Sequence, residues 1–213
     1  MLHLIPKKNN LKILCLGAHS DDIEIGCGGA LLKILKENSI EQVEWIVFAT
    51  NEQRKIEAET SAKNYLYGLN KANVSIYEFR DGFLPYHAIE IKEKFEEIKK
   101  RINPDIVFTH YRDDRHQDHR LISDLTWNTF RDNMILEYEI PKWDGDIGNP
   151  NFYVELNEKI LNKRNQLLKD CFITQKGKHW FKEEMFRSLA RIRGMESACE
   201  FAEAFYARKI NIF

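Results

Sequence analysis

Short apolar runs alternate with longer amphipathic segments along the first two-thirds of the chain. Each apolar run has the length of one buried strand, and each amphipathic segment carries apolar residues at helical spacing with charged residues on its outer face. The predicted strands are 11–18, 43–50, 74–79, 106–109 and 135–140. The predicted helices are 30–37, 53–69, 88–102 and 121–131. Because strands joined through helices require crossover connections, this order predicts an α/β fold, a Rossmann-like three-layer sandwich with a mostly parallel sheet.

The last third of the chain is less regular. Residues 142–151 (KWDGDIGNPN) are rich in turn formers and are expected to form a loop. Helical periodicity returns near 158–171 and 183–198. A length of 213 residues suits one hydrophobic core. We therefore expect a single domain over 1–213, in which 1–141 forms the βα core and 142–213 supplies a loop and C-terminal helices that close the site.

Composition and charge exclude several classes of protein. The 32 basic residues nearly cancel the 33 acidic ones, so the chain lacks the positive field with which proteins hold nucleic acid. No uncharged apolar run reaches the roughly 18 residues of a membrane-spanning helix. The four cysteines lie far apart without a C-x-x-C pair, which argues against a zinc ribbon or a disulfide framework and favours reduced thiols in a cytoplasm.

Two polar clusters follow predicted strands. Residues 19–22 (HSDD) come directly after the first strand, and residues 116–119 (HQDH) come shortly after the strand 106–109. In the strand order 3-2-1-4-5, which is common in doubly wound sheets, the first and fourth strands are neighbours, and ligands bind at their carboxyl ends. We therefore expect the two clusters to face each other in one ligand site.

The residue types in these clusters suit a catalytic zinc ion. Such a site uses three nitrogen or oxygen ligands from the protein and leaves the fourth position for water. His19, Asp22 and His119 are the predicted ligands, because Asp22 stands at the turn into a helix and can swing its carboxylate back toward His19. Asp21 is then left beside the metal, where a carboxylate can accept a proton from the water, and we assign it as the general base.

Two further residues of the second cluster have candidate roles. His116 is placed to stabilise the oxyanion that forms when water attacks a carbonyl, or to protonate the leaving amine. Asp118 could accept a hydrogen bond from one of the histidines and so fix its tautomer. The pattern does not decide whether His110, at the end of the strand before this cluster, belongs to the site.

The segment 18–29 (AHSDDIEIGCGG) resembles the A-H-P-D-D motif of the LmbE-like, or PIG-L, deacetylases, and HQDH resembles their second motif. The resemblance extends to Arg54 and Glu57, 139–141 (EIP), 174–175 (TQ), 190–194 (ARIRG) and 202–205 (AEAF). It implies the fold expected above, zinc held by His19, Asp22 and His119, and Asp21 as the base. It also implies hydrolysis of the N-acetyl group of an N-acetylglucosamine-type amino sugar or its conjugate, and a homo-oligomer.

Two departures from the family pattern concern the substrate. Ser20 replaces the usual proline, and the loop after Thr50 reads N-E-Q-R, shorter than usual and without its common glycine. That loop commonly lines the substrate pocket in similar enzymes, so the resemblance does not identify the sugar. Arg54 is a candidate for pairing with a substrate carboxylate or phosphate through its planar fork. Trp143 is a candidate for stacking on a sugar face, and a core plug is the alternative for such an aromatic residue.

Other functions remain to be weighed. Gly26, Gly28 and Gly29 follow a strand as in a dinucleotide-binding loop, but Leu31 stands where the third glycine of that motif belongs, so we expect the glycines to allow close packing beneath the metal site.

An amidase that cleaves a larger acyl amide of a sugar conjugate would need the same metal and base. A non-catalytic, metal-dependent sugar-binding module is the third possibility, although a binder would not need Asp21.

Overall fold

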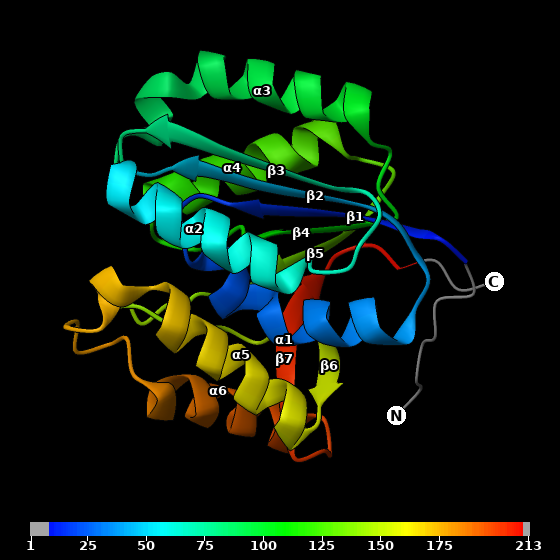
Figure 1. The fold of residues 1–213 in the computed structure, drawn as a ribbon, viewed down its shortest axis with the longest axis vertical. Coiled ribbons are helices and arrows are strands. Elements are labelled where there is room, and N and C mark those ends of the chain that lie inside the picture. The colour runs from blue at the N-terminus through cyan, green and yellow to red at the C-terminus, as the bar shows by residue number, and fades with distance from the viewer. Residues whose placement is uncertain (1–8, 211–213) are drawn as a thin grey trace.

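Seven strands form one sheet in the order β3-β2-β1-β4-β5-β7-β6 in the computed structural model, which describes residues 9–210 (Figure 1). The strands are β1 (Leu11–Gly17), β2 (Ile40–Ala49), β3 (Ala72–Phe79), β4 (Ile106–His110), β5 (Met134–Tyr138), β6 (Phe152–Leu156) and β7 (Phe201–Ala207). The first five pair in parallel, whereas β7 runs antiparallel to both β5 and β6. The predicted order 3-2-1-4-5 and the mostly parallel α/β sheet are therefore confirmed.

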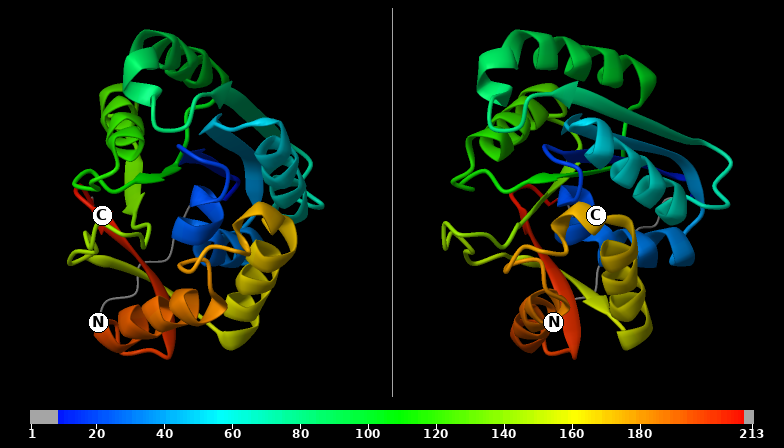
Figure 2. Two further views of the ribbon diagram at one scale, coloured as in Figure 1. Left: turned by 90° about the vertical axis from the view of Figure 1, so that its left-hand side faces the viewer. Right: turned by 60° about the vertical axis from the view of Figure 1, so that its left-hand side comes forward.

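Helices cover both faces of this sheet, as Figures 1 and 2 show. They are α1 (Asp22–Glu37), α2 (Glu52–Tyr65), α3 (Ala88–Arg101), α4 (Gln117–Thr129), α5 (Glu158–Cys171) and α6 (Glu183–Glu196), with short 3₁₀ helices η1 (Leu84–His87) and η2 (Ile173–Gln175). Among the described residues, none of these helices is both long and apolar enough to cross a membrane.

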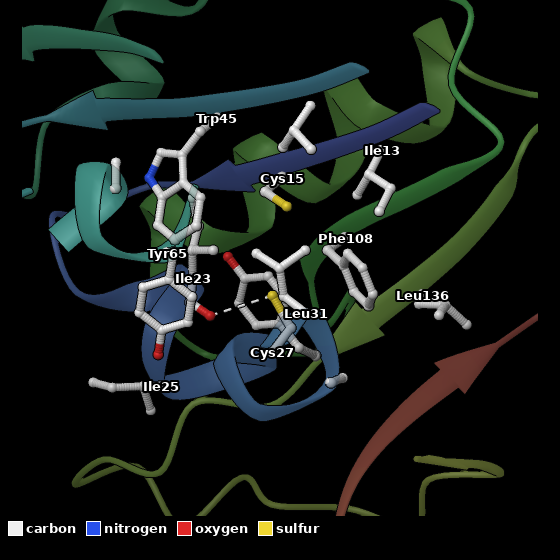
Figure 3. Close-up of a cluster of buried hydrophobic side chains, with 14 of the residues drawn as sticks. Ile13, Cys15, Ile23, Ile25, Cys27, Leu31, Trp45, Tyr65, Phe108 and Leu136 are labelled. Atoms are coloured by element: carbon white, nitrogen blue, oxygen red, sulfur yellow. Dashed lines mark hydrogen bonds between the residues drawn. The ribbon is translucent and has the colours of Figure 1, made fainter. Parts of the chain in front are cut away.

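Successive side chains of the central strands enter two separate cores, because a strand presents alternate residues to opposite faces. In β1, Ile13 and Cys15 pack with α1, α2 and α5, whereas Leu14 and Leu16 pack with α3 and α4. Figure 3 shows the first of these cores, with Trp45 of β2 and Phe108 of β4 beside the strand residues. Burial on both faces explains why these strands appear in the sequence as continuous apolar runs.

Two helices begin earlier than predicted. We expected starts at residues 30 and 121, but α1 begins at Asp22 and α4 at Gln117, so the cluster 19–22 forms the turn into α1 and the cluster 116–119 begins α4. Apolar periodicity does not mark these starts, because each helix begins with polar residues of the site, although Ile23 and Ile25 of α1 already belong to the core. Gly26, Gly28 and Gly29 consequently lie inside α1.

The glycines of α1 allow a close approach of helix and sheet, as predicted. A Cβ atom at Gly26 would lie 2.2 Å from Cδ2 of Tyr138, and one at Gly29 would lie 2.6 Å from Cδ1 of Leu156. The hydroxyl of Tyr138 donates a hydrogen bond to the carbonyl oxygen of Leu16 (2.6 Å). The first half of α1 is thus held against β5 and β6, directly beneath the polar clusters.

Strands β6 and β7 were not predicted, and the expectation of only a loop and helices over 142–213 is corrected to a loop, two strands and two helices. Every residue of β7 is buried, so its sequence shows no alternation of apolar and polar positions. Glu203 of this strand accepts hydrogen bonds from the backbone N–H groups of Gly29 (2.8 Å) and Ala30 (2.6 Å) and pairs with Arg164 (3.0 Å). A buried charge inside an apolar strand is tolerated here because it is fully partnered.

A second buried ion pair joins α6 to the end of β5. Arg193 donates to both carboxylate oxygens of Glu139, at 2.8 and 2.7 Å, and both side chains are buried. Removing one partner leaves the other charge unpaired inside the protein. The pair therefore fixes α6 on the sheet.

We expect Arg193→Met to lower the free energy of unfolding by about 3–5 kcal/mol, because the Glu139 carboxylate is then buried without its partner. Denaturant titration measures this change. Arg191→Met is the control, since Arg191 is an exposed arginine of the same helix, and its loss should cost less than about 1 kcal/mol. An equal loss for the two variants would show that the buried pair does not hold α6.

Candidate metal centre and active site

The two polar clusters meet at the carboxyl edge of the sheet, between β1 and β4. The chain leaves β1 at Gly17 and enters α1 at Asp22, and it leaves β4 at His110 and enters α4 at Gln117. Because β1 and β4 are neighbours, His19 and His119 come together although one hundred positions separate them. The expectation that the clusters face each other is confirmed.

Three donor atoms in this cluster have the mutual spacing of metal ligands. Nδ1 of His19 lies 3.1 Å from Nε2 of His119 and 3.4 Å from Oδ2 of Asp22. Nε2 of His119 and Oδ2 of Asp22 are 3.6 Å apart. Ligands that surround zinc tetrahedrally at about 2.0–2.2 Å lie roughly 3.3–3.6 Å from one another. All three residues are buried. The arrangement could therefore hold a small metal ion.

Carboxylates hold the outer nitrogen of each histidine. Nδ1 of His119 lies 2.9 Å from Oδ2 of Asp114, and Nε2 of His19 lies 3.1 Å from Oδ2 of Asp118 and 3.2 Å from Oδ1 of Asp81. Such contacts orient a metal-binding imidazole and fix its tautomer. The predicted contact of Asp118 with a histidine is present, and its partner is His19. The contact with His19 also lowers the pKa of Asp81 to about 2.

The electrostatic surroundings favour neutral His119 and anionic Asp22. Burial alone would raise the pKa of Asp22, but the imidazoles of His119, His110 and His19 hold that pKa well below its usual value. Burial lowers the pKa of His119 to about 3, and His110 acts in the same direction. Burial also opposes protonation of His19, yet the surrounding carboxylates raise its pKa well above the usual value. A metal cation bound among these donors would replace the proton that His19 otherwise binds.

Asp21 lies next to these donors but faces Arg54. Its Oδ1 accepts a hydrogen bond from Nη2 of Arg54 (2.5 Å), and its buried Oδ2 has no hydrogen-bond partner among the described residues. Burial raises the pKa of Asp21, although the guanidinium opposes this shift. Arg54 was expected to contact the substrate, and in the structure it contacts Asp21 and lies 3.9 Å from Asp81. The carboxylate thus keeps one oxygen available for a proton.

His116 is half-buried between the other histidines. Its ring centroid lies 4.9 Å from that of His19 and 4.6 Å from that of His119. Its Nδ1 accepts a hydrogen bond from the backbone N–H of Asp118 (3.2 Å), which places the ring proton of the neutral imidazole on Nε2. Burial, with His19 acting in the same direction, lowers the pKa of His116 and favours the neutral form.

Trp143 lies outside the cluster, with 78% of its surface exposed and its ring centroid 4.2 Å from that of His179. The neighbouring Lys142 does reach the cluster, because its Nζ lies 2.9 Å from Oδ2 of Asp114. The structure therefore brings together all the predicted metal-site and catalytic residues and Arg54, whereas Trp143 lies exposed outside the cluster.

Four residues of the site were missed or left open by sequence reasoning. His110 was left open; its Nε2 accepts the backbone N–H of Ala18 (2.9 Å), and its ring stacks on that of His119 at 3.9 Å. A lone pair that accepts this N–H is not available to a metal, so His110 supports the cluster. Asp114 could have been suspected from its place two positions before His116. Asp81 follows β3 and Lys142 follows β5, and no sequence motif marked either residue as part of the site.

Comparison with known proteins agrees with this geometry. A family model described as PIG-L, GlcNAc-PI de-N-acetylase, matches residues 14–130. A protein of Escherichia coli (strain K12) named Uncharacterized deacetylase YaiS is 29% identical over 148 residues, which cover 65% of this chain and 79% of that protein. The resemblance found in the sequence is confirmed.

Solved structures share the fold at low sequence identity. N,N'-diacetylchitobiose deacetylase from Pyrococcus horikoshii matches with a TM-score of 0.69 and 22% identity, over 91% of this chain and 82% of its own. GalB, the 4-carboxy-2-hydroxymuconate hydratase from Pseudomonas putida KT2440, matches with a TM-score of 0.76 and 15% identity, over 95% of this chain and 98% of its own. Because the matched family segment covers more than half of the 213 residues and contains both polar clusters, the chain belongs to the PIG-L family.

Proposed function

We propose that this chain is a zinc-dependent hydrolase that removes the acetyl group from an N-acetylated amino sugar of the N-acetylglucosamine type, or from its conjugate. The observation that carries the proposal is the triad of donor atoms 3.1–3.6 Å apart beside Asp21, whose Oδ2 has no hydrogen-bond partner among the described residues. Family membership and the names of the E. coli and Pyrococcus proteins support a deacetylase. GalB has the same fold and is a hydratase, so the fold alone does not fix the reaction.

In this proposal His19, Asp22 and His119 would hold Zn²⁺, which suits their two nitrogens and one oxygen. When bound, the ion supplies a Lewis acid that lowers the pKa of water and polarises a carbonyl group. Asp114 and Asp118 keep the two imidazoles in the required orientation through their outer nitrogens.

Asp21 acts as the general base, and its free Oδ2 takes the proton from the water that attacks the acetamide carbonyl. A raised pKa makes it a better proton acceptor than an ordinary carboxylate. His116, neutral and protonated on Nε2, is better suited to donate a hydrogen bond to the oxyanion than to protonate the amine. Asp21 can then return its proton to the leaving nitrogen, which becomes the free amine.

A homo-oligomeric state and a cytoplasmic location follow from the resemblance and from the cysteine pattern, and Arg54 keeps a candidate role at the substrate because its Nε has no partner among the described residues. The amidase for a larger acyl group requires the same residues and differs only in the size of the acyl site.

The reaction is tested by acetate release from a panel of N-acetylglucosamine conjugates. We expect turnover by purified protein, loss of turnover with a chelator, and recovery with added zinc. Turnover that a chelator leaves unchanged, in protein shown to have lost its metal, would contradict the role of zinc. Release of a longer acyl acid without release of acetate would favour the larger-acyl amidase.

The separate roles of base and ligand are tested by two variants. Asp21→Asn should keep one metal ion per chain and lose roughly 10²–10⁴-fold in kcat, because only proton transfer is impaired. His119→Ala should lose both metal and turnover. His87→Ala is the control, because His87 lies outside the cluster and contacts Glu90. Metal content by elemental analysis and kcat are measured on the same samples, and full activity of Asp21→Asn would rule out our mechanism.

A further inference from the structure

Lys142 bridges two carboxylates beside the proposed metal centre. Its Nζ lies 2.9 Å from Oδ2 of Asp114 and 2.5 Å from Oδ2 of Asp146. The exposed fractions of these three side chains are only 12%, 2% and 8%. Charges in such surroundings act strongly on one another, because little water is present to screen them. The ammonium group is therefore positioned to influence the groups that the two carboxylates contact.

The same oxygen of Asp114 contacts Lys142 and a proposed zinc ligand. Oδ2 of Asp114 lies 2.9 Å from Nδ1 of His119, whereas Nε2 of that imidazole belongs to the donor triad. Oδ1 of Asp114 accepts the backbone N–H of His116 (2.8 Å), so two contacts besides that of Lys142 orient the carboxylate. Loss of the ammonium group would thus change the charge around Asp114 more than the position of Asp114.

Asp146 is held on Lys142 by a further contact. Its Oδ2 also accepts the backbone N–H of Arg115 (2.8 Å), in the segment between β4 and α4. Figure 2 shows this segment, in green, beside the connection 142–151, in yellow-green. The charge of Asp146 therefore offsets part of the ammonium charge, and the two carboxylates compete for one cation.

These contacts predict the sign of each residue's effect on a metal ion. A carboxylate on the outer nitrogen of a metal-binding imidazole makes the imidazole a better electron donor. A cation on that carboxylate draws negative charge away from the imidazole, and it also repels a second cation directly. Both effects have the same sign, so Lys142 should lower the affinity of the triad for Zn²⁺, and Asp146 should raise it.

We propose that Lys142 is a positioning residue that acts through Asp114 on His119 and makes the centre bind Zn²⁺ less tightly than the triad would without it. Weaker donation by a ligand leaves a bound cation a stronger Lewis acid, which favours polarisation of a carbonyl group over tight metal binding. The inference rests on the proposed function for the assignment of His119 as a ligand. It adds to the centre a residue outside the two polar clusters.

The affinity for Zn²⁺ tests the proposal without substrate, by titration of the zinc-loaded protein with a chelator of known affinity at a single pH. Lys142→Met should bind Zn²⁺ at least about fivefold more tightly, because Asp114 keeps its contacts with His119 and His116 and loses only the ammonium group. Asp146→Asn should bind Zn²⁺ at least about fivefold more weakly, because the whole ammonium charge then acts on Asp114. Lys142→Arg keeps the charge and should restore the wild-type affinity to within about twofold.

Shifts in opposite directions separate an effect of charge from a loss of structure. A loosened connection 142–151 would weaken zinc binding in both variants, so weaker or unchanged binding by Lys142→Met would overturn the proposal. Denaturant titration first establishes that each variant is folded. If Lys142→Met does not fold, Asp146→Asn decides: weaker binding supports the proposal, and equal or tighter binding overturns it.

Lys159→Met is the matched control. Lys159 is an exposed lysine at the start of α5, and its replacement changes the net charge by the same amount as Lys142→Met. Salt and water screen an exposed charge, so the affinity for Zn²⁺ should stay within about twofold of wild type. A shift as large as that of Lys142→Met would show that net charge, and not the contact with Asp114, sets the affinity.

Turnover separates this inference from the proposed reaction. In protein that releases acetate, Lys142→Met should lower kcat and kcat/KM together and leave KM unchanged, because the bound ion is then a weaker Lewis acid. Opposite shifts in zinc affinity without acetate release from any conjugate would support the role of Lys142 and contradict the deacetylase. Acetate release with equal zinc affinity in wild type, Lys142→Met and Asp146→Asn would support the deacetylase and overturn the role of Lys142.

Discussion

Parallel pairing of β1 with β4 is the constraint on which the site depends. The paired residues, Ile13 with Ile106 through Cys15 with Phe108, are buried and fix the register of the two strands. With this register, the turn that ends in Asp22 and the helix that carries His119 leave the same edge of the sheet. A shift of either strand would move His19 away from His119 and Asp118, the two residues of α4 that its imidazole nitrogens contact.

The C-terminal third is fastened to this edge by buried polar pairs whose members are far apart in sequence. Glu57 accepts from the backbone and hydroxyl of Thr174 (2.7 and 2.6 Å), Glu139 pairs with Arg193, and Glu203 accepts from the backbone of α1. These residues belong to the short segments that resemble the family outside its two metal motifs. Their resemblance therefore has a structural explanation, since they hold η2, α6 and β7 against the rest of the fold.

The sequence was sufficient for the sheet order and for the meeting of the two clusters, because both follow from apolar runs and from the rule for parallel sheets. It was not sufficient for β7, whose seven residues are buried throughout and lack the alternation that marks a half-exposed strand. Asp81 and Lys142 could not be found either, since each joins the cluster through tertiary contacts that no local pattern encodes. The sequence places His110 at the end of a strand, but only the hydrogen bond from the backbone N–H of Ala18 shows that it supports the site and is not a metal ligand.

Asp21 and Asp22 are adjacent, and both are buried, yet their surroundings shift their pKa values in opposite directions. Three imidazoles keep Asp22 anionic, which is the state that a metal ligand needs. Asp21 meets a single guanidinium through one oxygen, and burial raises its pKa, which is the condition for a base that must accept and then release a proton. Neighbouring carboxylates divided in this way are the usual sign of separate chemical roles. The division arises from local geometry: the turn into α1 directs one side chain toward the histidines of β4 and α4 and the other toward Arg54 of α2.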